Sequence, residues 1–303
     1  MSQLEYLEKF SKKINGKLIF NYNLKKSNWF NIGGIAKAYF KPDGLSELIS
    51  FIKKFQHYER IFIIGAGSNI LIKDDFFDGV VIKLGKNFSN ISILPNKTII
   101  AGSAATDKQL SDFAYENSIE GFEFLSCIPG TVGGGLRMNS GCFKKEFKDI
   151  LVSVQAIDKK GNVLTIPASK IKFDYRNNDL DKGLIFLSAS FQGKSGDKEK
   201  IMECIKTFKE KKAKTQPTKI KTGGSTFKNP IEQTDKKVWE LIKDSVPLDT
   251  SFGDAKISEK HSNFFVNTNN ASFEEMYSLI QFVRQNVKSK TGILLETEVE
   301  IIK

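Results

Sequence analysis

One stretch of the chain places a hydroxyl between a flexible backbone and a cation: Gly223-Gly224-Ser225-Thr226-Phe227-Lys228-Asn229-Pro230. The glycines let the backbone approach a ligand closely, because they carry no Cβ. Lys228 offers positive charge to an anion, and Pro230 ends any regular element that begins there. The stretch therefore fits a site for an anionic ligand, although a polar turn without a ligand fits the same residues.

A glycine-rich segment further upstream could hold phosphate. Gly65-Ala66-Gly67-Ser68-Asn69 directly follows the apolar run Ile61–Ile64. It begins like a dinucleotide-binding fingerprint, but Ile70 stands where the third glycine belongs. What remains is a loop of backbone N–H groups, with the Ser68 and Asn69 side chains, that can grip a pyrophosphate. A tight turn at the end of a strand is the alternative.

A second segment holds four glycines within six residues, Gly130, Gly133, Gly134 and Gly135. Ordered glycine costs conformational entropy, so this cluster suggests a backbone pressed against something flat or anionic. Two such loops in neighbouring domains predict one long ligand that contains a diphosphate, such as FAD.

Three carboxylates, Glu296, Glu298 and Glu300, alternate near the C-terminal end. Residues two apart share one face of a β-strand, so all three would point the same way. The spacing does not choose between them, and three exposed carboxylates on an edge strand are the alternative.

The composition limits the classes of protein. The chain has 303 residues, 40% of them hydrophobic, which is enough for two or three domains with a sizeable core. It has no run of about 18 apolar residues, so no membrane span is expected. The polar start, Met1–Tyr6, is unlike a secretory signal. Cys127, Cys142 and Cys204 indicate a reduced cytosolic protein without structural disulfides.

The charge limits the partners. The formal net charge is +11, but the lysines are scattered except in the run 209–214, where a solvated helix face explains them. Nucleic acid is therefore disfavoured, and the basic surface serves equally well to collect small anionic ligands. His57 and His261 are the only histidines in the sequence, and without a ligand cluster they predict no catalytic metal.

Helices and strands must position these groups, and hydrophobic periodicity predicts where these elements lie. Helices are predicted at 45–55, around 110–114, in a charged segment ending near Lys214, at 238–242 and at 273–288. Strands are predicted at 61–64, 80–84, 99–101, 152–157, 163–166, 184–187 and 298–302. Residues 160–162 are predicted to turn a hairpin, 193–197 to form a linker, and Ser225 to lie in a loop.

Seven motifs follow one another along nearly the whole chain: Trp29–Gly34, Gly65–Asn69, Ile128–Asn139, Tyr175-Arg176, Gly224–Pro230, Ile257–Phe264 and Glu298-Val299. In this order they resemble the UDP-N-acetylenolpyruvylglucosamine reductase family, flavoenzymes of cytosolic peptidoglycan precursor synthesis. The short interval between Arg176 and Ser225 is similar to the compact variant, which lacks an inserted tyrosine-bearing loop over the substrate.

The chain departs from the family pattern at three places. Glu300 stands where the family usually has arginine, which leaves no basis for a cation role there. Cys142-Phe143-Lys144 replaces a commoner Ala-Tyr-Gly, so the local loop shape can differ. Asn178 replaces a usual serine.

The resemblance implies an α+β fold. Residues 1–198 would form a vanillyl-alcohol-oxidase-type FAD-binding region of two α+β subdomains, about 1–86 and 87–198. Residues 199–303 would form a C-terminal α+β substrate-binding domain, with the last strand returning to the first subdomain.

The resemblance also implies FAD as cofactor and NADPH as reductant. Neither histidine lies in a covalent-flavin context, so the FAD is expected to be non-covalent. The cofactor contacts that the family pattern carries over are Gly65, Ala66, Gly67, Ser68, Asn69, Ile128, Pro129, Gly130, Thr131, Gly133, Gly134, Asn139 and Gly141.

The implied substrate is an enolpyruvyl ether of a UDP-sugar. Hydride reaches its terminal alkene carbon, and negative charge develops on the adjacent carbon and the carboxylate. By the resemblance, Arg176 binds this charge with its two-pronged guanidinium, Ser225 donates the proton to carbon, and Glu298 is a polar partner opposite Arg176. The implied substrate contacts are Tyr175, Arg176, Lys228, Asn229, His261 and Asn263.

A serine needs help to lose its proton, and Lys219, Lys221 and Lys228 all lie near Ser225 in sequence. The sequence does not choose between them. The expected partners are the UDP-sugar and NADPH, with no nucleic acid and no membrane, for a cytoplasmic monomer.

Two rival functions differ in class. A sugar or aldonolactone oxidase with the same flavin fold would explain the glycine loops, but not Gly224–Pro230 or Glu298. A non-enzymatic basic binding protein would be colourless and would bind nucleic acid in a salt-sensitive manner.

Overall fold

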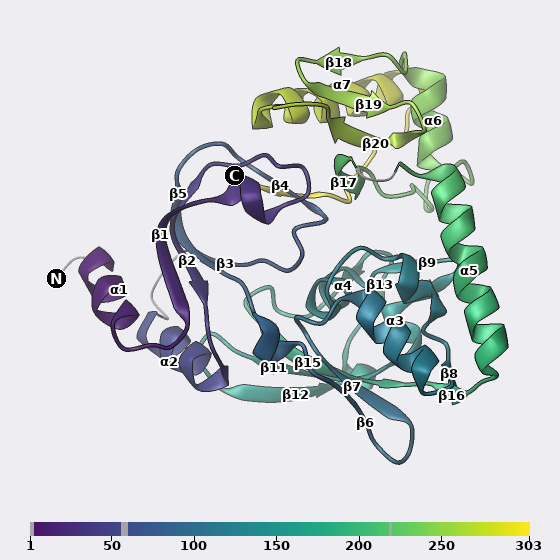
Figure 1. Ribbon diagram of the computed structural model, residues 1–303. Helices are drawn as coiled ribbons and strands as arrows, with labels where there is room; N and C mark the ends of the chain where they lie inside the picture. Colours follow the sequence, from purple (N-terminus) through teal and green to yellow (C-terminus); the bar gives the residue numbers. More distant parts are fainter. Residues whose placement is uncertain (1–2, 56–59, 218–219) are drawn as a thin grey trace. The chain divides into compact units, whose positions relative to one another are not determined.

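The computed structural model describes residues 3–55, 60–217 and 220–303 (Figure 1). The chain divides into two compact units, each built from three segments. Unit 1 comprises Met1–Tyr22, Ala36–Ala66 and Asp78–Lys209, and unit 2 comprises Asn23–Ile35, Gly67–Phe77 and Glu210–Lys303. Helix α5 (Lys198–Thr215) carries the chain from one unit into the other. The domain boundary at 198/199 stays a prediction.

The first sheet of unit 1 has the strand order β1-β2-β5-β3, formed by Lys17–Asn23, Ile35–Lys41, Phe77–Ile82 and Ile61–Ile63. Helices α1 (Gln3–Ser11) and α2 (Leu45–Phe55) belong to the same core. The predicted helix at 45–55 is confirmed, because its apolar residues recur at helical spacing and are buried. Strand β5 begins and ends earlier than the predicted 80–84.

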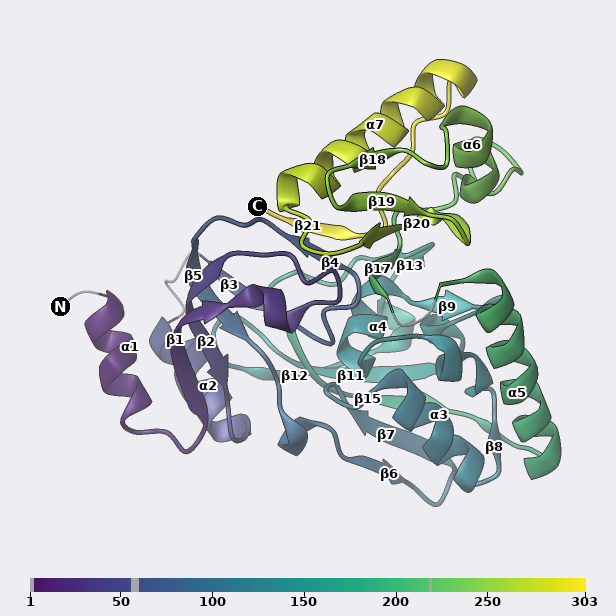
Figure 2. The same cartoon turned by 45° about the horizontal axis from the view of Figure 1, so that its top comes forward.

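The second sheet of unit 1 is antiparallel throughout, in the order β12-β11-β15-β7-β6. Its strands are Val163–Pro167, Leu151–Ile157, Ile185–Gln192, Thr98–Gly102 and Ile91–Ile93. Helices α3 (Asp107–Glu116) and α4 (Val132–Met138) lie on one face of this sheet (Figure 2). The predicted hairpin is confirmed, with Ile157 opposite Val163 and Gly161 at φ +81° in the turn.

Residues 193–197 are not a plain linker, which corrects the sequence-based prediction. Strand β16 (Lys194–Ser195) pairs with β8 (Ile119–Glu120). A side chain on Gly193 would collide with Ile119. The glycine that suggested flexibility therefore serves close packing between two short strands.

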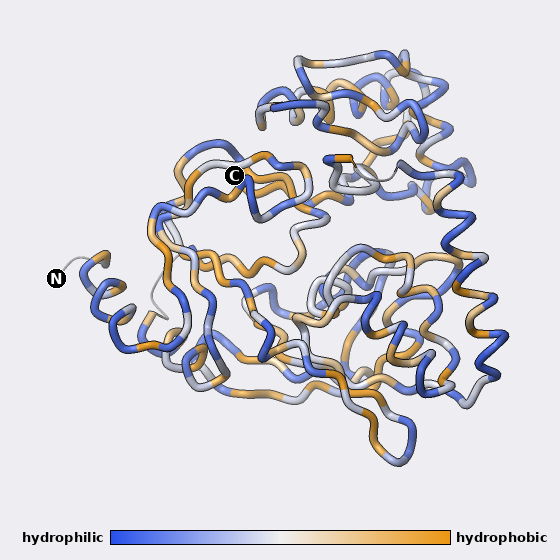
Figure 3. Tube along the Cα trace, viewed as in Figure 1, coloured by the Kyte–Doolittle hydropathy of each residue, from blue (hydrophilic) through white to orange (hydrophobic). Residues whose placement is uncertain are grey.

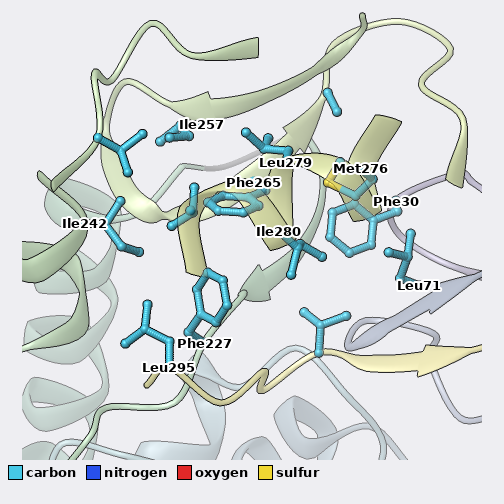
Figure 4. Packing of buried hydrophobic residues seen from close by; sticks show 14 of the residues in the cluster. Phe30, Leu71, Phe227, Ile242, Ile257, Phe265, Met276, Leu279, Ile280 and Leu295 are labelled. Carbon is cyan, nitrogen blue, oxygen red and sulfur yellow. The ribbon is translucent and has the colours of Figure 1, made fainter. Parts of the chain in front are cut away.

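Unit 2 contains a four-stranded sheet in the order β17-β20-β19-β18, formed by Lys221–Ser225, His261–Asn267, Ala255–Ser258 and Ser251–Phe252. Helices α6 (Val238–Ser245) and α7 (Phe273–Thr291) pack on it around a core with Phe227, Phe265 and Leu295 (Figure 4). Ser272 and Glu275 form a capping box that starts α7, and Gly292 at φ +75° ends it.

The last strand, β21 (Glu300–Ile302), pairs in parallel with β4 (Ile70–Ile72), so the C-terminal end returns to a segment near the N-terminal third of the chain. The predicted strand 298–302 is wrong at its start, because the chain bends at Glu298 and Val299. The expectation that three glutamates share one strand face is therefore also wrong.

The remaining elements are short. Two small hairpins pair β9 (Gly141–Cys142) with β10 (Lys145–Glu146), and β13 (Phe173–Asp174) with β14 (Asn177–Asn178). The 3-10 turns are η1 (Leu24–Ser27), η2 (Lys86–Phe88), η3 (Glu123–Cys127), η4 (Phe147–Asp149) and η5 (Ala168–Lys170).

Helix α5 is hydrophilic along most of its length, as predicted for a solvated helix (Figure 3). Across the described residues, none of the helices combines the length and the apolar character that a membrane crossing needs.

Candidate functional site

The first glycine segment joins β3 to β4 and is held tightly by its neighbours. Gly67 has φ +70°, and a side chain there would collide with the backbone of Ser27 and Asn28. Its carbonyl accepts a hydrogen bond from the N–H of Trp29 at 2.9 Å. The loop therefore needs glycine for its own conformation, and Ala66 and Ser68 are held within it, partly exposed.

The second glycine segment is a helix, α4, and not the predicted loop. Thr131 caps it, with Oγ1 accepting from the N–H of Gly134 at 3.4 Å. A Cβ on Gly133 would lie 3.1 Å from Cβ of Ser103, and one on Gly135 would collide with the ring of Phe147. The flat group against which this backbone is pressed thus includes one of the protein's own phenylalanines.

Two N–H groups of this segment are taken up by hydrogen bonds within the protein. Those of Val132 and Gly133 donate to the carbonyls of Ala105 and Ser103, each at 2.9 Å. Gly134 alone is exposed among the three consecutive glycines, and a Cβ added there would meet only Thr131 Oγ1, at 3.6 Å. It is the glycine of α4 that close packing does not explain.

The two glycine segments meet within unit 1. A Cβ on Gly65 would lie 2.7 Å from Oγ1 of Thr131, and no other residue's atoms come closer than that threonine. A side chain at Gly65 would therefore collide with Thr131 at the start of α4. A glycine beside a helix start is compatible with the diphosphate-containing ligand predicted from the sequence.

Further predicted cofactor residues lie just before α4. Ile128 packs against the core of the second sheet, Pro129 is exposed, and the carbonyl of Gly130 accepts from the N–H of Asp107 at 3.3 Å. Asp107 itself was missed by the sequence analysis, since an acidic residue in the first turn of a helix is ordinary.

Asp107 is fully buried, and neither carboxyl oxygen has a hydrogen-bond partner. Burial raises the pKa of the Asp107 carboxyl well above its usual range. An orphaned carboxyl beside Gly130 is a second observation that fits a polar ligand in this region.

Asn139, a predicted cofactor contact, is fully buried at the left-handed C-cap of α4. Its Nδ2 donates to Oε2 of Glu146 and to the carbonyl of Asp174, both at 3.0 Å. Its Oδ1 accepts from the N–H of Lys148 at 3.1 Å. Asn139 thus links the end of α4 to Glu146, Lys148 and Asp174, and its direct contact with the cofactor stays a prediction.

Tyr175 and Arg176 form the turn between β13 and β14, where Arg176 has φ +55°. One guanidinium nitrogen donates to the carbonyl of Gly141 at 2.8 Å, and another lies 3.9 Å from Oε1 of Glu146. The guanidinium also stacks over the Tyr175 ring, 5.1 Å from its centre. Gly141, a predicted cofactor contact, and Glu146, which the sequence did not reveal, thus hold Arg176.

Ser225 ends strand β17 opposite Phe264, so it lies at a strand end and not in the predicted loop. The register shifts between Thr222 and Ser225, with Gly224 at φ +80°. A side chain on Gly223 would collide with the ring of Phe30. The glycine pair therefore forms a bulge that aims Ser225, as bulges beside functional sites commonly do.

Phe227 anchors the chain after Ser225, because its ring is fully buried in the core of unit 2 (Figure 4). Asn263 brackets it: Oδ1 accepts from the Phe227 N–H at 3.0 Å, and Nδ2 donates to the Phe227 carbonyl at 2.9 Å. Asn263 is itself buried, so the structure shows it holding this backbone, while a direct substrate contact stays a prediction.

Glu298 lies beside this segment. Its N–H donates to the carbonyl of Thr226 at 2.8 Å, so the backbones of Ser225 and Glu298 run next to each other within unit 2. Glu298 is half-buried, whereas Glu296 and Glu300 are exposed. Tertiary structure therefore distinguishes one glutamate where spacing could not.

The three candidate lysines have different surroundings. The ammonium of Lys221 donates to the carbonyl of Asn269, and that of Lys228 pairs with Glu296 at 3.5 Å. Lys219 lies outside the described residues. Asn229, a predicted substrate contact, accepts from the N–H of Val238 at 3.0 Å and so helps to start α6.

His261 is half-buried between Trp239 and Phe264. Its Nδ1 accepts from the N–H of Asn263 at 3.2 Å, and burial lowers the pKa of the imidazole. A neutral ring with its proton on Nε2 results. His57 lies outside the described residues, which themselves contain no group of three metal-ligating side chains.

Comparison with known proteins identifies the family of this chain. The FAD binding domain matches residues 36–167, and the C-terminal domain of UDP-N-acetylenolpyruvoylglucosamine reductase matches residues 216–302. Curated proteins of that name include one from Pelagibacter ubique, 68% identical over 99% of both chains. Another, from Rickettsia conorii, is 44% identical over 95% of this chain and 97% of its own.

A solved structure has the same fold. The UDP-N-acetylenolpyruvylglucosamine reductase of Thermus caldophilus superimposes with a TM-score of 0.81 at 26% identity, over 96% of this chain and all of that one. The predicted α+β fold with a vanillyl-alcohol-oxidase-type FAD-binding region is confirmed, and the non-enzymatic alternative is wrong. The chain belongs to the UDP-N-acetylenolpyruvoylglucosamine reductase family of FAD-dependent oxidoreductases.

Proposed function

We propose that the protein uses NADPH to reduce UDP-N-acetyl-3-O-(1-carboxyvinyl)-glucosamine to UDP-N-acetylmuramate, a step of peptidoglycan precursor synthesis. The curated relatives carry the name of this activity, and they match the chain from end to end. Because a UDP-sugar and NADPH are cytoplasmic metabolites, we place the protein in the cytoplasm. We propose a monomer with a substrate-binding domain at 199–303.

The observation that carries this proposal is that the backbone segments of Ser225 and Glu298 lie next to each other. The Thr226 carbonyl joins the two backbones, and the glycine bulge aims the serine. A hydroxyl and a carboxylate on adjacent segments are suited to deliver a proton and to respond to charge at the same carbon.

FAD, bound without a covalent bond, would accept hydride from NADPH and supply it to the terminal alkene carbon. The residues we propose to hold it are Gly65–Asn69, the stretch Ile128–Gly134, Asn139 and Gly141. Gly65 and Thr131 support this assignment, because the two glycine segments meet there so closely that a side chain at Gly65 would collide with Thr131.

The other steps belong to side chains of the protein. Arg176 would bind the substrate carboxylate, where negative charge grows as the hydride arrives. Ser225 would give its proton to the carbon next to that carboxylate. Glu298 would lie opposite Arg176 as a polar partner of the intermediate, on the same side as Ser225.

The lysine nearest to this task is Lys228. It follows Ser225 by three residues, and its side chain is 25% exposed and pairs with Glu296 at 3.5 Å, whereas the Lys221 ammonium donates to the carbonyl of Asn269. We propose that Lys228 stabilises the Ser225 alkoxide. We further propose that Tyr175, Asn229, His261 and Asn263 line or support the substrate site.

Ser225→Ala tests the proposal. The first half-reaction, oxidation of NADPH, should keep its parent rate, because the hydroxyl takes no part in it. The second, reduction of the enolpyruvyl substrate, should slow by about 10²–10⁴-fold, as is typical when a general acid is lost. Stopped-flow measurement of flavin absorbance separates the two.

Ser245→Ala is the matched control, since that buried hydroxyl in α6 has no hydrogen-bond partner. It should leave both half-reactions unchanged. If Ser225→Ala reduces the substrate as fast as the parent protein, Ser225 is not the proton donor.

A further inference from the structure

Glu298 lies on a bend, so the strand ladder does not determine where its carboxylate points. The backbone hydrogen bonds of β21 begin only at Glu300. Val299 turns inward and is 1% exposed, while Glu298 is half-buried. Some other contact must keep this peptide from rotating.

Asn69 supplies that contact. Its Nδ2 donates to the carbonyl of Glu298 at 3.0 Å, and its own carbonyl accepts from the N–H of Glu300, also at 3.0 Å. Asn69 therefore holds the chain on both sides of Val299. On the other side, the N–H of Glu298 is tied to the carbonyl of Thr226 at 2.8 Å.

We infer that Asn69 is a positioning residue for Glu298: its carboxamide holds the Glu298 peptide so that the carboxylate keeps its orientation beside the Ser225 segment. This inference rests on the proposed function, in which Glu298 acts during reduction of the substrate. It gives Asn69 a role distinct from the cofactor contact predicted for its loop.

The chemistry of the contact requires an amide. The Glu298 carbonyl is an acceptor, so it needs the N–H donor that asparagine provides and aspartate lacks. Without that donor, a partly buried carbonyl loses its partner, and the peptide can turn to find another. A displacement of about 1 Å at a reacting group can cost about 10²-fold in rate.

The loop that carries Asn69 is rigid enough for this task. Gly67 is fixed two residues earlier by its left-handed φ and by the hydrogen bond from Trp29. The segment proposed to hold the cofactor through its backbone thus also holds Glu298, through one side chain. Cofactor loop and carboxylate are connected within unit 2 by a single residue.

The test uses the FAD-loaded protein with Asn69→Ala and Asn69→Asp. Both should slow the second half-reaction by about 10- to 100-fold, with the first half-reaction near its parent rate. Gln233→Ala is the matched control. Gln233 makes two hydrogen bonds to Leu294, four residues before Glu298 in the same segment, at 3.1 and 3.2 Å. Its loss should leave both half-reactions unchanged.

A double-mutant cycle separates positioning from general destabilisation. In the Glu298→Gln background, Asn69→Ala should slow the second half-reaction by less than roughly threefold further, because no carboxylate remains to be positioned. Full additivity of the two losses would overturn the inference. So would Asn69 variants that weaken FAD binding but reduce substrate at the parent rate once loaded.

The same experiment distinguishes the inference from the proposed function. If Glu298→Gln alone reduces substrate at the parent rate, the assignment of Glu298 fails, and with it the basis for Asn69. If Glu298→Gln is slow while Asn69→Ala is not, only the positioning role of Asn69 fails. A thermal melt of each loaded variant shows that the comparison is made on folded protein.

Discussion

At the scale of single residues, Arg176 combines strain with tight support. Its φ of +55° lies in the left-handed region, which costs a residue with a Cβ roughly 1–2 kcal/mol. The Gly141 carbonyl, the Glu146 carboxylate and the Tyr175 ring hold the guanidinium in return. Strain kept in place by neighbours is typical of residues that must present a group in one orientation.

Arg176→Lys should keep the positive charge but lose the planar fork that matches a carboxylate. We expect the second half-reaction to slow by about 10²-fold in stopped-flow measurements. Arg137→Lys is the control, because Arg137 donates to the carbonyls of Leu180 and Leu184 and stacks on Phe186. It should lower thermal stability more than turnover. Equal turnover in Arg176→Lys and the parent would remove Arg176 from the charge-binding role.

Asp107 predicts a pH dependence of stability. Burial raises the pKa of its carboxyl in the folded state, so between the unfolded value of about 4 and the raised folded value only the folded protein keeps the proton. Stability therefore falls as pH rises through this window, and the loss is complete above the raised pKa. Asp107→Asn removes the titration.

The free energy of unfolding of Asp107→Asn, relative to that of the parent, should therefore be higher at pH 7 than at pH 4, which means that the variant gains relative stability as pH rises. Urea denaturation at a series of pH values measures this difference. Asp112→Asn is the control, because Asp112 is a partly exposed carboxylate of the same helix that pairs with Lys108, and this variant should show no such rise. A difference for Asp107→Asn that does not change with pH would contradict the prediction.

At the scale of elements, the turn of the β9–β10 hairpin has residue types that do not suit its backbone conformation. Its turn residues, Phe143 and Lys144, have φ of +53° and +64°, which glycine adopts without cost. The turn is therefore left-handed at two residues that carry a Cβ. Phe143 offsets part of the strain by stacking on Phe208, with ring centres 4.1 Å apart.

Lys144→Gly should raise the free energy of unfolding by about 1 kcal/mol, because it relieves the left-handed strain. Lys145→Gly, one residue on in strand β10, should lower it by roughly 0.5–1 kcal/mol through lost backbone entropy. Urea midpoints at constant slope measure both. Equal losses in the two variants would show that the turn is not strained.

At the scale of the whole molecule, the net charge of +11 suits the two ligands that we propose, NADPH and a UDP-sugar, because both are anionic. Both must exchange hydride with the same flavin, so we expect them to bind in turn. Initial rates should give parallel double-reciprocal lines, and kcat/KM for each ligand should fall as salt is added. Intersecting lines would require both ligands to bind together, against this prediction. An uncharged osmolyte at matched osmolality is the control for the salt effect.

Much of the fold could be predicted from the sequence, whereas the roles of the predicted site residues stay predictions. Helix α2 followed from periodicity, because Leu48, Phe51 and Ile52 recur at helical spacing and are buried. The β11–β12 hairpin followed from two apolar runs joined by a turn, although Val163 and Leu164 of β12 are exposed. The glycine segments could not be interpreted so well, because a glycine required by packing has the same sequence signal as one that touches a ligand. Gly135 meets Phe147, and Gly223 meets Phe30, through contacts that no local pattern of glycines reveals.

The sequence by itself determined the family and the kinds of chemical group available. The order of the motifs along the chain can be recognised without knowing which residues they contact in the fold. Only the tertiary structure decided which of Glu296, Glu298 and Glu300 lies beside Ser225, and that Asn69 and Glu146 support the groups proposed to act. Spacing of two residues assumes a continuous strand, but the chain bends at Glu298, where Thr226 and Asn69 take its two backbone hydrogen bonds. Those partners lie 72 and 229 residues away in the chain, where no local pattern can reach them.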